Sequence, residues 1–491
     1  MKKKSILLIA SMFLSAYLAV GIAQENLQKS TNRQKFQEMI PVVDNWLNYQ
    51  AFKSQIPGIS AGILHVDTVL LNNQYGLADL ESKEKLQPEH LFCCGSHSKM
   101  FTATAILQLH QARKLRLQDK VNLHLPWFTS PNDPSLDEIT IFHLLTHTAG
   151  IITDARLPNG YPPYRIEHVK EIVQQGISTS KIGEMIKYSN FGYNILGAII
   201  EVVSGTSCDR YIDQHILQPL DMTHSAMGLT SKNSHLIAKG YTTWYPDRAR
   251  EKIEKTVFRN IYGIHSAVGG LVTNAEDLMK FWSAYLSGNQ TLFSDSFKMD
   301  MRKQQVRIDN SRRGVGYEIA DFPAGNTYFQ IIGGTFGYHT QSGIVPQDNL
   351  AVVVLTTTTD APVSTYSAGI INLLNFVKSR WDDLQLSSSD QNLPPGNHNM
   401  RGIFECPYGI YYITQIGDKL VIFDLDSLDP AADPIILEPH GDNKFISSVP
   451  LFFAKENEPI EFRPDGAGGM NLYDSLGRIV RRFSFDAYFR L

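Results

Sequence analysis

Residues 96–99 read Ser96-His97-Ser98-Lys99, and the run that follows, Met-Phe-Thr-Ala-Thr-Ala-Ile-Leu-Gln-Leu, contains neither glycine nor proline. This run is apolar on nearly every face of a helix, which is typical of a buried helix. One helical turn would place the Lys99 amine beside the Ser96 hydroxyl. An amine in that position can activate a serine as a nucleophile, so both residues are candidate catalytic groups. The alternative is a capped helix start with a solvated lysine, and the quartet alone does not exclude it.

A second polar triplet, Tyr188-Ser189-Asn190, opens another apolar run further along the chain. Together with the Ser-x-x-Lys quartet, in this order, it resembles the motifs of the penicillin-recognising serine hydrolases. The likeness is to beta-lactamase-related proteins near class C beta-lactamases, penicillin-binding proteins, D-aminopeptidases and carboxylesterases. Further strings stand where that family carries similar ones, over roughly residues 40–380: Pro57–Leu64, Tyr75–Asp79, Ile139–Gly150 and Ala267–Leu278.

The resemblance implies an α+β fold of the beta-lactamase/transpeptidase type. In that fold an antiparallel sheet flanked by helices lies beside an all-helical lobe, and Ser96 would lie at their junction. The chain's own patterns agree, because short strand-like runs separated by turns cover residues 327–332, 340–345 and 350–356. A helix-like segment follows from about residue 363 to 381.

A third family element departs from the pattern. The matching string is Ile331-Ile332-Gly333-Gly334-Thr335-Phe336-Gly337-Tyr338, whereas most relatives carry Lys or His at the position of Ile331. The resemblance implies that the Gly334 N–H pairs with the Ser96 N–H as an oxyanion hole, with Gly333 and Thr335 beside the substrate. A cation at the first position helps to hold a substrate carboxylate, and isoleucine cannot do so. Acyl transfer therefore remains the expected chemistry, while carboxylate-directed substrates are disfavoured.

The polar groups divide into a nucleophile and its helpers. Ser96 Oγ would attack an ester, amide or lactam carbonyl, and either neutral Lys99 or a Tyr188 phenolate would accept the proton. The sequence leaves that choice open. Asn190 would donate a hydrogen bond to the substrate or to Lys99, or would simply cap a helix.

We therefore expect an exported serine hydrolase that forms an acyl-enzyme on small ester or amide substrates, D-amino-acid peptides included. The alternatives are a beta-lactamase, and a catalytically silent penicillin-binding-like protein that holds a ligand without turnover. The expected partner is a small molecule or short peptide. A formal charge of −4, with no basic cluster beyond the first residues, does not favour nucleic acid.

The N-terminus predicts export. Lys2-Lys3-Lys4 precedes an apolar stretch up to Ala23, with small residues before a polar turn, so residues 1–23 are a predicted signal peptide. An uncleaved membrane anchor is the competing interpretation. The mature protein is expected in a bacterial periplasm or outside the cell.

Cysteines and histidines give no cofactor or metal prediction. The four cysteines, Cys93, Cys94, Cys208 and Cys406, have no spacing that selects a disulfide pairing. His143 and His147 stand four residues apart, as zinc ligands do, but without the accompanying glutamate structural use is favoured. His339, just beyond the glycine-rich turn, is a candidate to replace the missing cation.

The C-terminal part predicts a second domain. Residues 386–400 are polar and rich in proline and glycine, as linkers are. Residues 401–491 carry closely spaced strand-like runs and predict a small β-barrel-like domain that resembles a lipocalin-like domain of some relatives. The catalytic domain would then cover residues 33–385.

Overall fold

A computed structural model describes residues 31–155, 165–243, 250–252, 265–322, 325–385, 400–406, 409–441, 443–449, 456–465, 470–473 and 479–483. The chain divides into two compact units: residues 51–367, and residues up to 50 together with those from 368 onward. The predicted signal peptide and nearly all of the predicted linker lie outside the described residues.

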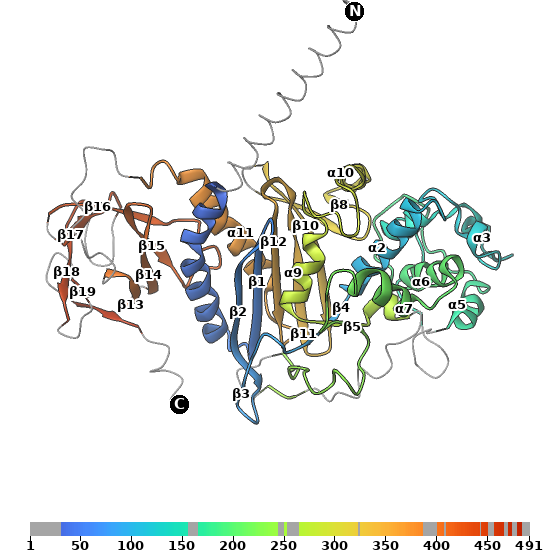
Figure 1. Ribbon diagram of the computed structural model, residues 1–491, viewed down its shortest axis with the longest axis horizontal. Helices are drawn as coiled ribbons and strands as arrows, with labels where there is room; N and C mark the ends of the chain where they lie inside the picture. Colours follow the sequence, from blue (N-terminus) through green and yellow to red (C-terminus); the bar gives the residue numbers. More distant parts are fainter. Residues whose placement is uncertain are drawn as a thin grey trace, which may run out of the picture. The chain divides into compact units, whose positions relative to one another are not determined.

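The first unit is built on a nine-stranded sheet, which Figure 1 shows with its helical lobe (cyan and green). All neighbouring strands of this sheet pair antiparallel. In spatial order the strands are β3 (Glu84–Lys85), β2 (Thr68–Asp79), β1 (Gly58–His65), β12 (Leu350–Thr356), β11 (Tyr338–Val345), β10 (Thr327–Thr335), β9 (Glu318–Asp321), β8 (Ser311–Arg313) and β7 (Val306–Ile308).

The central strands β1 and β12 are buried along their whole length, which explains why their sequences are mostly apolar and do not alternate between apolar and polar residues. Helix α9 (Ala275–Ser283) packs against them through Met279, whose sulfur would lie 2.8 Å from a Cβ added to Gly62. The three strand-like runs predicted in this region correspond to β10, β11 and β12. The beta-lactamase/transpeptidase-like prediction is confirmed.

Helix α2 (Ser98–Gln111) is buried from Ser98 to Leu107, as its sequence predicts. The other helices of this unit are α3 (Val121–His124), α4 (Ile141–Leu145), α5 (Ile166–Val173), α6 (Asn190–Ser204), α7 (Cys208–Ile212), α8 (Ser266–Gly269) and α10 (Asp295–Lys303), with short 3₁₀ or π turns at Pro134–Glu138, Asp213–Leu217 and Pro346–Asp348. Among them, α2 lies against α6, α7 and α8. A small sheet of β4 (Phe92–Gly95), β6 (Leu271–Thr273) and β5 (Ala226–Met227) leads into α2.

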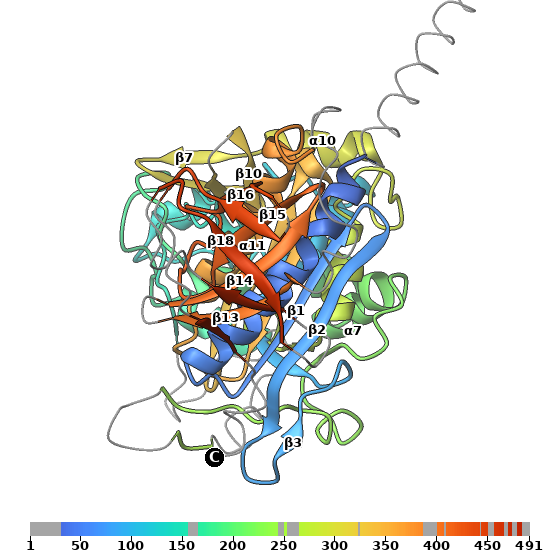
Figure 2. The same ribbon diagram turned by 90° about the vertical axis from the view of Figure 1, so that its left-hand side faces the viewer.

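The second unit contains a closed antiparallel barrel (Figure 2), so the predicted C-terminal all-β architecture is confirmed. Its strands are β13 (Gly402–Cys406), β14 (Gly409–Ile416), β15 (Lys419–Asp424), β16 (Ile435–Pro439), β17 (Lys444–Ile446), β18 (Ile460–Pro464), β19 (Met470–Tyr473) and β20 (Ile479–Arg482). Residues 451–453 (Leu-Phe-Phe) form one of the strand-like runs of the C-terminal sequence and lie outside the described residues.

The unit that contains the barrel also includes helical residues from both ends of the predicted catalytic domain, residues 33–385. Trp46 Nε1 in the helix of residues 31–53 donates to the Ser427 carbonyl at 2.9 Å, and Gln50 Nε2 donates to the Leu425 carbonyl at 2.7 Å. Phe376 of α11 (Val363–Arg380) meets Phe423 edge to face. The predicted domain limits, 33–385 and 401–491, differ from this division and stay a prediction.

Candidate active site

Ser96 lies in the tight turn between β4 and α2. Gly95, just before it, has φ +51°, and a Cβ there would lie 2.6 Å from the Gly334 carbonyl oxygen. Only glycine tolerates both conditions at low cost. Ser98 fastens the other side of the turn, because its Oγ donates to the Gly95 carbonyl and accepts from the Leu271 N–H, both at 2.8 Å. The turn therefore holds a partly exposed Ser96 in one place.

The structure brings three of the predicted residues together. Lys99 Nζ donates to Ser96 Oγ at 3.0 Å, and the Tyr188 hydroxyl is 2.6 Å from the same oxygen. Lys99 also donates to the Val268 carbonyl at 3.0 Å, while its side chain is only 1% exposed. Serine, lysine and tyrosine therefore form one hydrogen-bonded cluster across α2 and the segment leading into α6.

Burial shifts the pKa values of Lys99 and Tyr188 in opposite directions. It lowers the pKa of the Lys99 amine to about 7, against an opposing pull from the Asp154 carboxylate. Burial also raises the pKa of the Tyr188 phenol to about 12, although its hydrogen bond with Ser96 opposes the change. Near neutral pH the amine is therefore partly neutral and can accept a proton, whereas the phenol remains protonated.

The ring of His147 packs against the ring of Tyr188, a contact that the sequence did not predict. The two rings lie 4.5 Å apart, and His147 Nδ1 accepts from the Ser189 N–H at 3.1 Å. Burial lowers the pKa of His147 well below its usual value, so its ring stays neutral. His143 instead accepts from the Thr140 N–H at the start of α4. The described residues contain no cluster of three or more metal-ligating side chains.

Asn190 is the first residue of α6 and points to a different partner from those predicted. Its Nδ2 donates to Asp154 Oδ1 at 2.8 Å, and its Oδ1 is buried without a partner among the described residues. The helix cap is Ser189, whose Oγ accepts from the Gly192 N–H at 2.9 Å. A contact of Asn190 with substrate stays a prediction.

The glycine pair on β10 lies against the nucleophile turn, as its contact with Gly95 shows. Above Gly334 there is open space, since no atom lies within 4 Å of an added Cβ, and Thr335 beside it is partly exposed. Gly333 is packed, with the Cys94 carbonyl oxygen 2.0 Å from where its Cβ would be. A side chain is therefore excluded at Gly333 by close packing, whereas the position of Gly334 faces open space.

Ile331 is itself 4% exposed and part of the core, and among the described residues neither His339 nor Arg313 is a free cation that could take the place of the missing one. His339 is bound to the Ala361 carbonyl through Nδ1 at 2.7 Å. The positive charge of Arg313 on β8 opposes the rise that burial causes in the pKa of the Tyr188 phenol, but its guanidinium pairs with Glu318 at 2.7 Å. The Arg313 guanidinium is thus already paired with a carboxylate.

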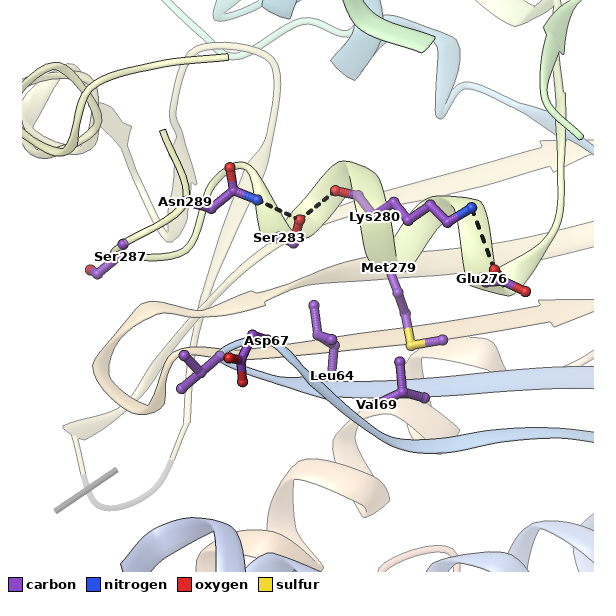
Figure 3. A pocket seen from close by; sticks show the side chains of 11 residues that line it. Leu64, Asp67, Val69, Glu276, Met279, Lys280, Ser283, Ser287 and Asn289 are labelled. Atoms are coloured by element: carbon purple, nitrogen blue, oxygen red, sulfur yellow. Dashed lines mark hydrogen bonds and ion pairs between the residues drawn. The ribbon is translucent and has the colours of Figure 1, made fainter. Parts of the chain in front are cut away.

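A separate hollow of about 530 Å³ lies between the β1–β2 turn and α9 (Figure 3). Leu64 and Val69 form its strand side, and Glu276, Met279 and Lys280 face it from the helix. None of the candidate catalytic residues lines it.

The two cysteines just before Ser96, Cys93 and Cys94, are buried thiols and poor candidates for a second nucleophile. All four are free thiols, and burial raises the pKa of Cys93 to about 12 and that of Cys94 well above its ordinary value. Within the described part of the chain, no helix combines the length and apolarity needed to cross a membrane.

An antiparallel sheet beside a helical lobe, with a serine at the start of the buried helix, defines the class of proteins related to penicillin-recognising serine enzymes. A sequence profile described as "Beta-lactamase" matches residues 34–373, well over half of the chain. The chain belongs to the beta-lactamase family.

Named relatives bear out this membership. "Protein flp" of Staphylococcus aureus (strain N315) is 33% identical over 238 residues, which are 48% of this chain and 47% of that protein. The chain thus spans about half the length of this relative. A protein of Bacillus subtilis (strain 168) with the provisional name penicillin-binding protein PbpX is 29% identical over 307 residues, covering 60% of this chain and 71% of its own.

Solved structures share the fold. The octameric penicillin-binding protein homologue from Pyrococcus abyssi superposes with a TM-score of 0.59 at 22% identity, over 90% of this chain and 100% of its own. A class C beta-lactamase gives a TM-score of 0.59 at 19% identity, over 68% of this chain and 95% of its own. At these identities the likeness describes the fold alone.

Proposed function

We propose that the protein is a serine hydrolase that forms an acyl-enzyme at Ser96 on small esters or amides, D-amino-acid peptides included. One observation carries the proposal: Ser96 Oγ is within hydrogen-bond distance of both Lys99 Nζ, at 3.0 Å, and the Tyr188 hydroxyl, at 2.6 Å. A serine held between an amine and a phenol has both a proton acceptor and a proton donor at hand.

Lys99 is the general base of this proposal, and the lowered pKa of its buried amine supports that role. As Ser96 Oγ attacks the carbonyl carbon, the neutral amine takes its proton and becomes an ammonium. The Tyr188 hydroxyl donates to the departing oxygen or nitrogen and regains a proton from that ammonium. Water then hydrolyses the acyl-serine by the same groups acting in reverse.

The developing oxyanion is stabilised by the N–H groups of Ser96 and Gly334. The close approach of Gly95 to Gly334 and the open space above Gly334 support this assignment. Preorganised backbone donors of this kind contribute roughly 10²- to 10³-fold to the rate in serine hydrolases.

The apolar Ile331 favours substrates without a carboxylate next to the reacting carbonyl. The substrate would be a small molecule or short peptide met in a bacterial periplasm or outside the cell. That location is carried by the signal-like sequence of residues 1–23.

Hydrolysis of a series of p-nitrophenyl esters and D-amino-acid amides tests the proposal. Ser96→Ala should abolish turnover, and Lys99→Met and Tyr188→Phe should each lower kcat by about 10²-fold or more. Thr104→Val is the matched control, because Thr104 is an equally buried residue of α2 that bonds to Tyr285. Undiminished turnover by Ser96→Ala would refute the proposal, and binding without turnover by the native protein would favour a silent ligand-binding protein.

A further inference from the structure

His97, between the nucleophile and Ser98, is buried at 1% exposure and touches strand β11 with both ring nitrogens. Nε2 lies 2.8 Å from Ser342 Oγ, and Nδ1 lies 3.1 Å from Thr340 Oγ1. Ser342 Oγ also lies 2.7 Å from Trp282 Nε1, and Thr340 Oγ1 donates to the Gly333 carbonyl at 3.2 Å. A continuous row of hydrogen bonds therefore runs from α9 to β10 through the histidine.

The groups at the two ends of this row, the Trp282 indole N–H and the Gly333 carbonyl, determine which atom donates in each hydrogen bond. An indole N–H can only donate, and a backbone carbonyl can only accept. Because Thr340 Oγ1 donates to the Gly333 carbonyl, the bond between Thr340 and His97 is donated by Nδ1–H, whose proton is shared between Thr340 Oγ1 and the Cys94 carbonyl. The neutral ring then leaves Nε2 as an acceptor, which receives the Ser342 proton.

The ring stays neutral across the working pH range. Burial lowers the pKa of His97 to about 3, although a hydrogen bond to the Cys94 carbonyl opposes the change. His97 therefore neither accepts the Ser96 proton nor titrates between pH 5 and pH 9, and its use lies in its contacts.

Those contacts end on the peptide group that bears the proposed oxyanion donor. The Gly333 carbonyl and the Gly334 N–H belong to one planar unit, so a bond that fixes the carbonyl also fixes the direction of the N–H. The packing is close: a Cβ on Gly333 would lie 2.6 Å from His97 Nδ1 and 2.7 Å from Thr340 Oγ1. An accepted bond at the carbonyl also polarises the N–H toward stronger donation.

We propose that His97 is a positioning residue that, through Thr340, orients the Gly333–Gly334 peptide so that the Gly334 N–H faces the oxyanion. The inference rests on the proposed acyl-enzyme chemistry and deepens it. In this inference His97, the residue after Ser96, links the start of α2 to strand β10 through Thr340. A merely structural histidine would fill the same space without affecting the transition state in particular.

Two amide variants separate these roles. The amide nitrogen of His97→Asn falls near the place of Nδ1 and can still donate to Thr340, whereas the amide of His97→Gln reaches the place of Nε2 and Ser342. His97→Asn should keep kcat within about 3-fold of the native value, while His97→Gln should lose about 10- to 100-fold. This loss is below that expected for outright removal of an oxyanion donor.

The change should fall on kcat and leave KM within about 2-fold, because an oxyanion donor acts chiefly in the transition state. Thr340→Val, which removes the last link, should behave as His97→Gln does. Thr104→Val should leave kcat and KM unchanged. The midpoint of the kcat/KM pH profile should not move in any of these variants, because none of them replaces Lys99.

Equal kcat values for the Asn and Gln variants, whether both native-like or both reduced, would overturn the inference. So would a loss expressed in KM alone. Mass spectrometry of the native protein after ester treatment distinguishes a failure of the role proposed for His97 from a failure of the proposed acyl-enzyme function. If native Ser96 is not acylated, the proposed function fails, whereas a native-like Gln variant that acylates Ser96 refutes only the role of His97.

Discussion

Replacing Lys99 with methionine should lower kcat by about 10²-fold or more yet stabilise the protein, and the gain in stability should depend on pH. Among the described residues, the hydrogen-bond partners of the buried amine are both neutral: Ser96 Oγ and the Val268 carbonyl. At pH 6 it is protonated in the native protein, where its pKa is about 7, and in the unfolded chain, where it takes the ordinary value of 10.5. The native state then bears the full cost of burying a charge, which methionine of similar length avoids.

Between these two pKa values the unfolded chain binds more protons than the native protein, so native stability rises with pH. The expected rise follows from 2.303RT per pH unit once the native amine is neutral. From pH 6 to pH 9 the native protein should therefore gain roughly 3 kcal/mol relative to Lys99→Met, in which the group is absent. The methionine variant should be clearly the more stable protein at pH 6 and lose most of that lead by pH 9.

Urea unfolding followed by tryptophan fluorescence, at pH 6 and pH 9, measures this double difference. All other titrating groups are shared and cancel. Ser96→Ala is the matched control, since it lacks activity but keeps the buried amine, and should follow the native pH dependence. An equal stability difference at both pH values would show that Lys99 does not lose its proton in this range, and would refute its assignment as the base.

Other changes test other parts of the account. The kcat/KM of a neutral ester should rise with pH through a midpoint near 7, the pKa of Lys99, and a flat profile from pH 5 to pH 9 would contradict the role of the amine. Gly333→Ala should lower both kcat and Tm, because its Cβ would lie 2.0 Å from the Cys94 carbonyl, whereas Gly334→Ala should keep the native Tm, as it enters open space. Ile331→Lys should raise the ratio of kcat/KM for carboxylate-bearing over neutral substrates; efficient hydrolysis of penicillins by the native protein would speak against the reasoning. A chain ending at residue 385 should keep activity on small esters but bind more apolar dye, because Trp46 and Gln50 lose their partners Ser427 and Leu425. Loss of small-ester activity in a soluble, folded truncation would instead show that the barrel contributes to the site.

The sequence predicts the contact between Ser96 and Lys99 because that part of the candidate site is local. One helical turn joins Ser96 to Lys99, and the family resemblance supplies Tyr188. The fold follows from the same motifs and from apolar runs such as residues 350–356, which become a fully buried strand.

Contacts that depend on how strands far apart in the chain pair with one another could not be predicted from the sequence. His97 meets Thr340 and Ser342 only because β11 pairs with β10 beside the nucleophile turn, 243 and 245 residues along the chain. The spacing of His143 and His147 is that of two zinc ligands on one helix. However, α4 ends at Leu145, and His147 lies beyond it with φ +61°, so the two histidines do not share a helix face. The attachment of residues 31–50 to the barrel likewise depends on bonds spanning 375 residues or more.

Intact-mass analysis tests the central claim most directly. The native protein and Ser96→Ala are exposed briefly to activated esters, D-amino-acid amides and penicillins, quenched in acid, and weighed, with peptide mapping of any adduct. The account predicts an added acyl group on Ser96 from a neutral ester or amide, none on Ser96→Ala, and slow or no reaction with penicillins. An adduct on another residue, or turnover by the native protein and Ser96→Ala alike, would contradict it.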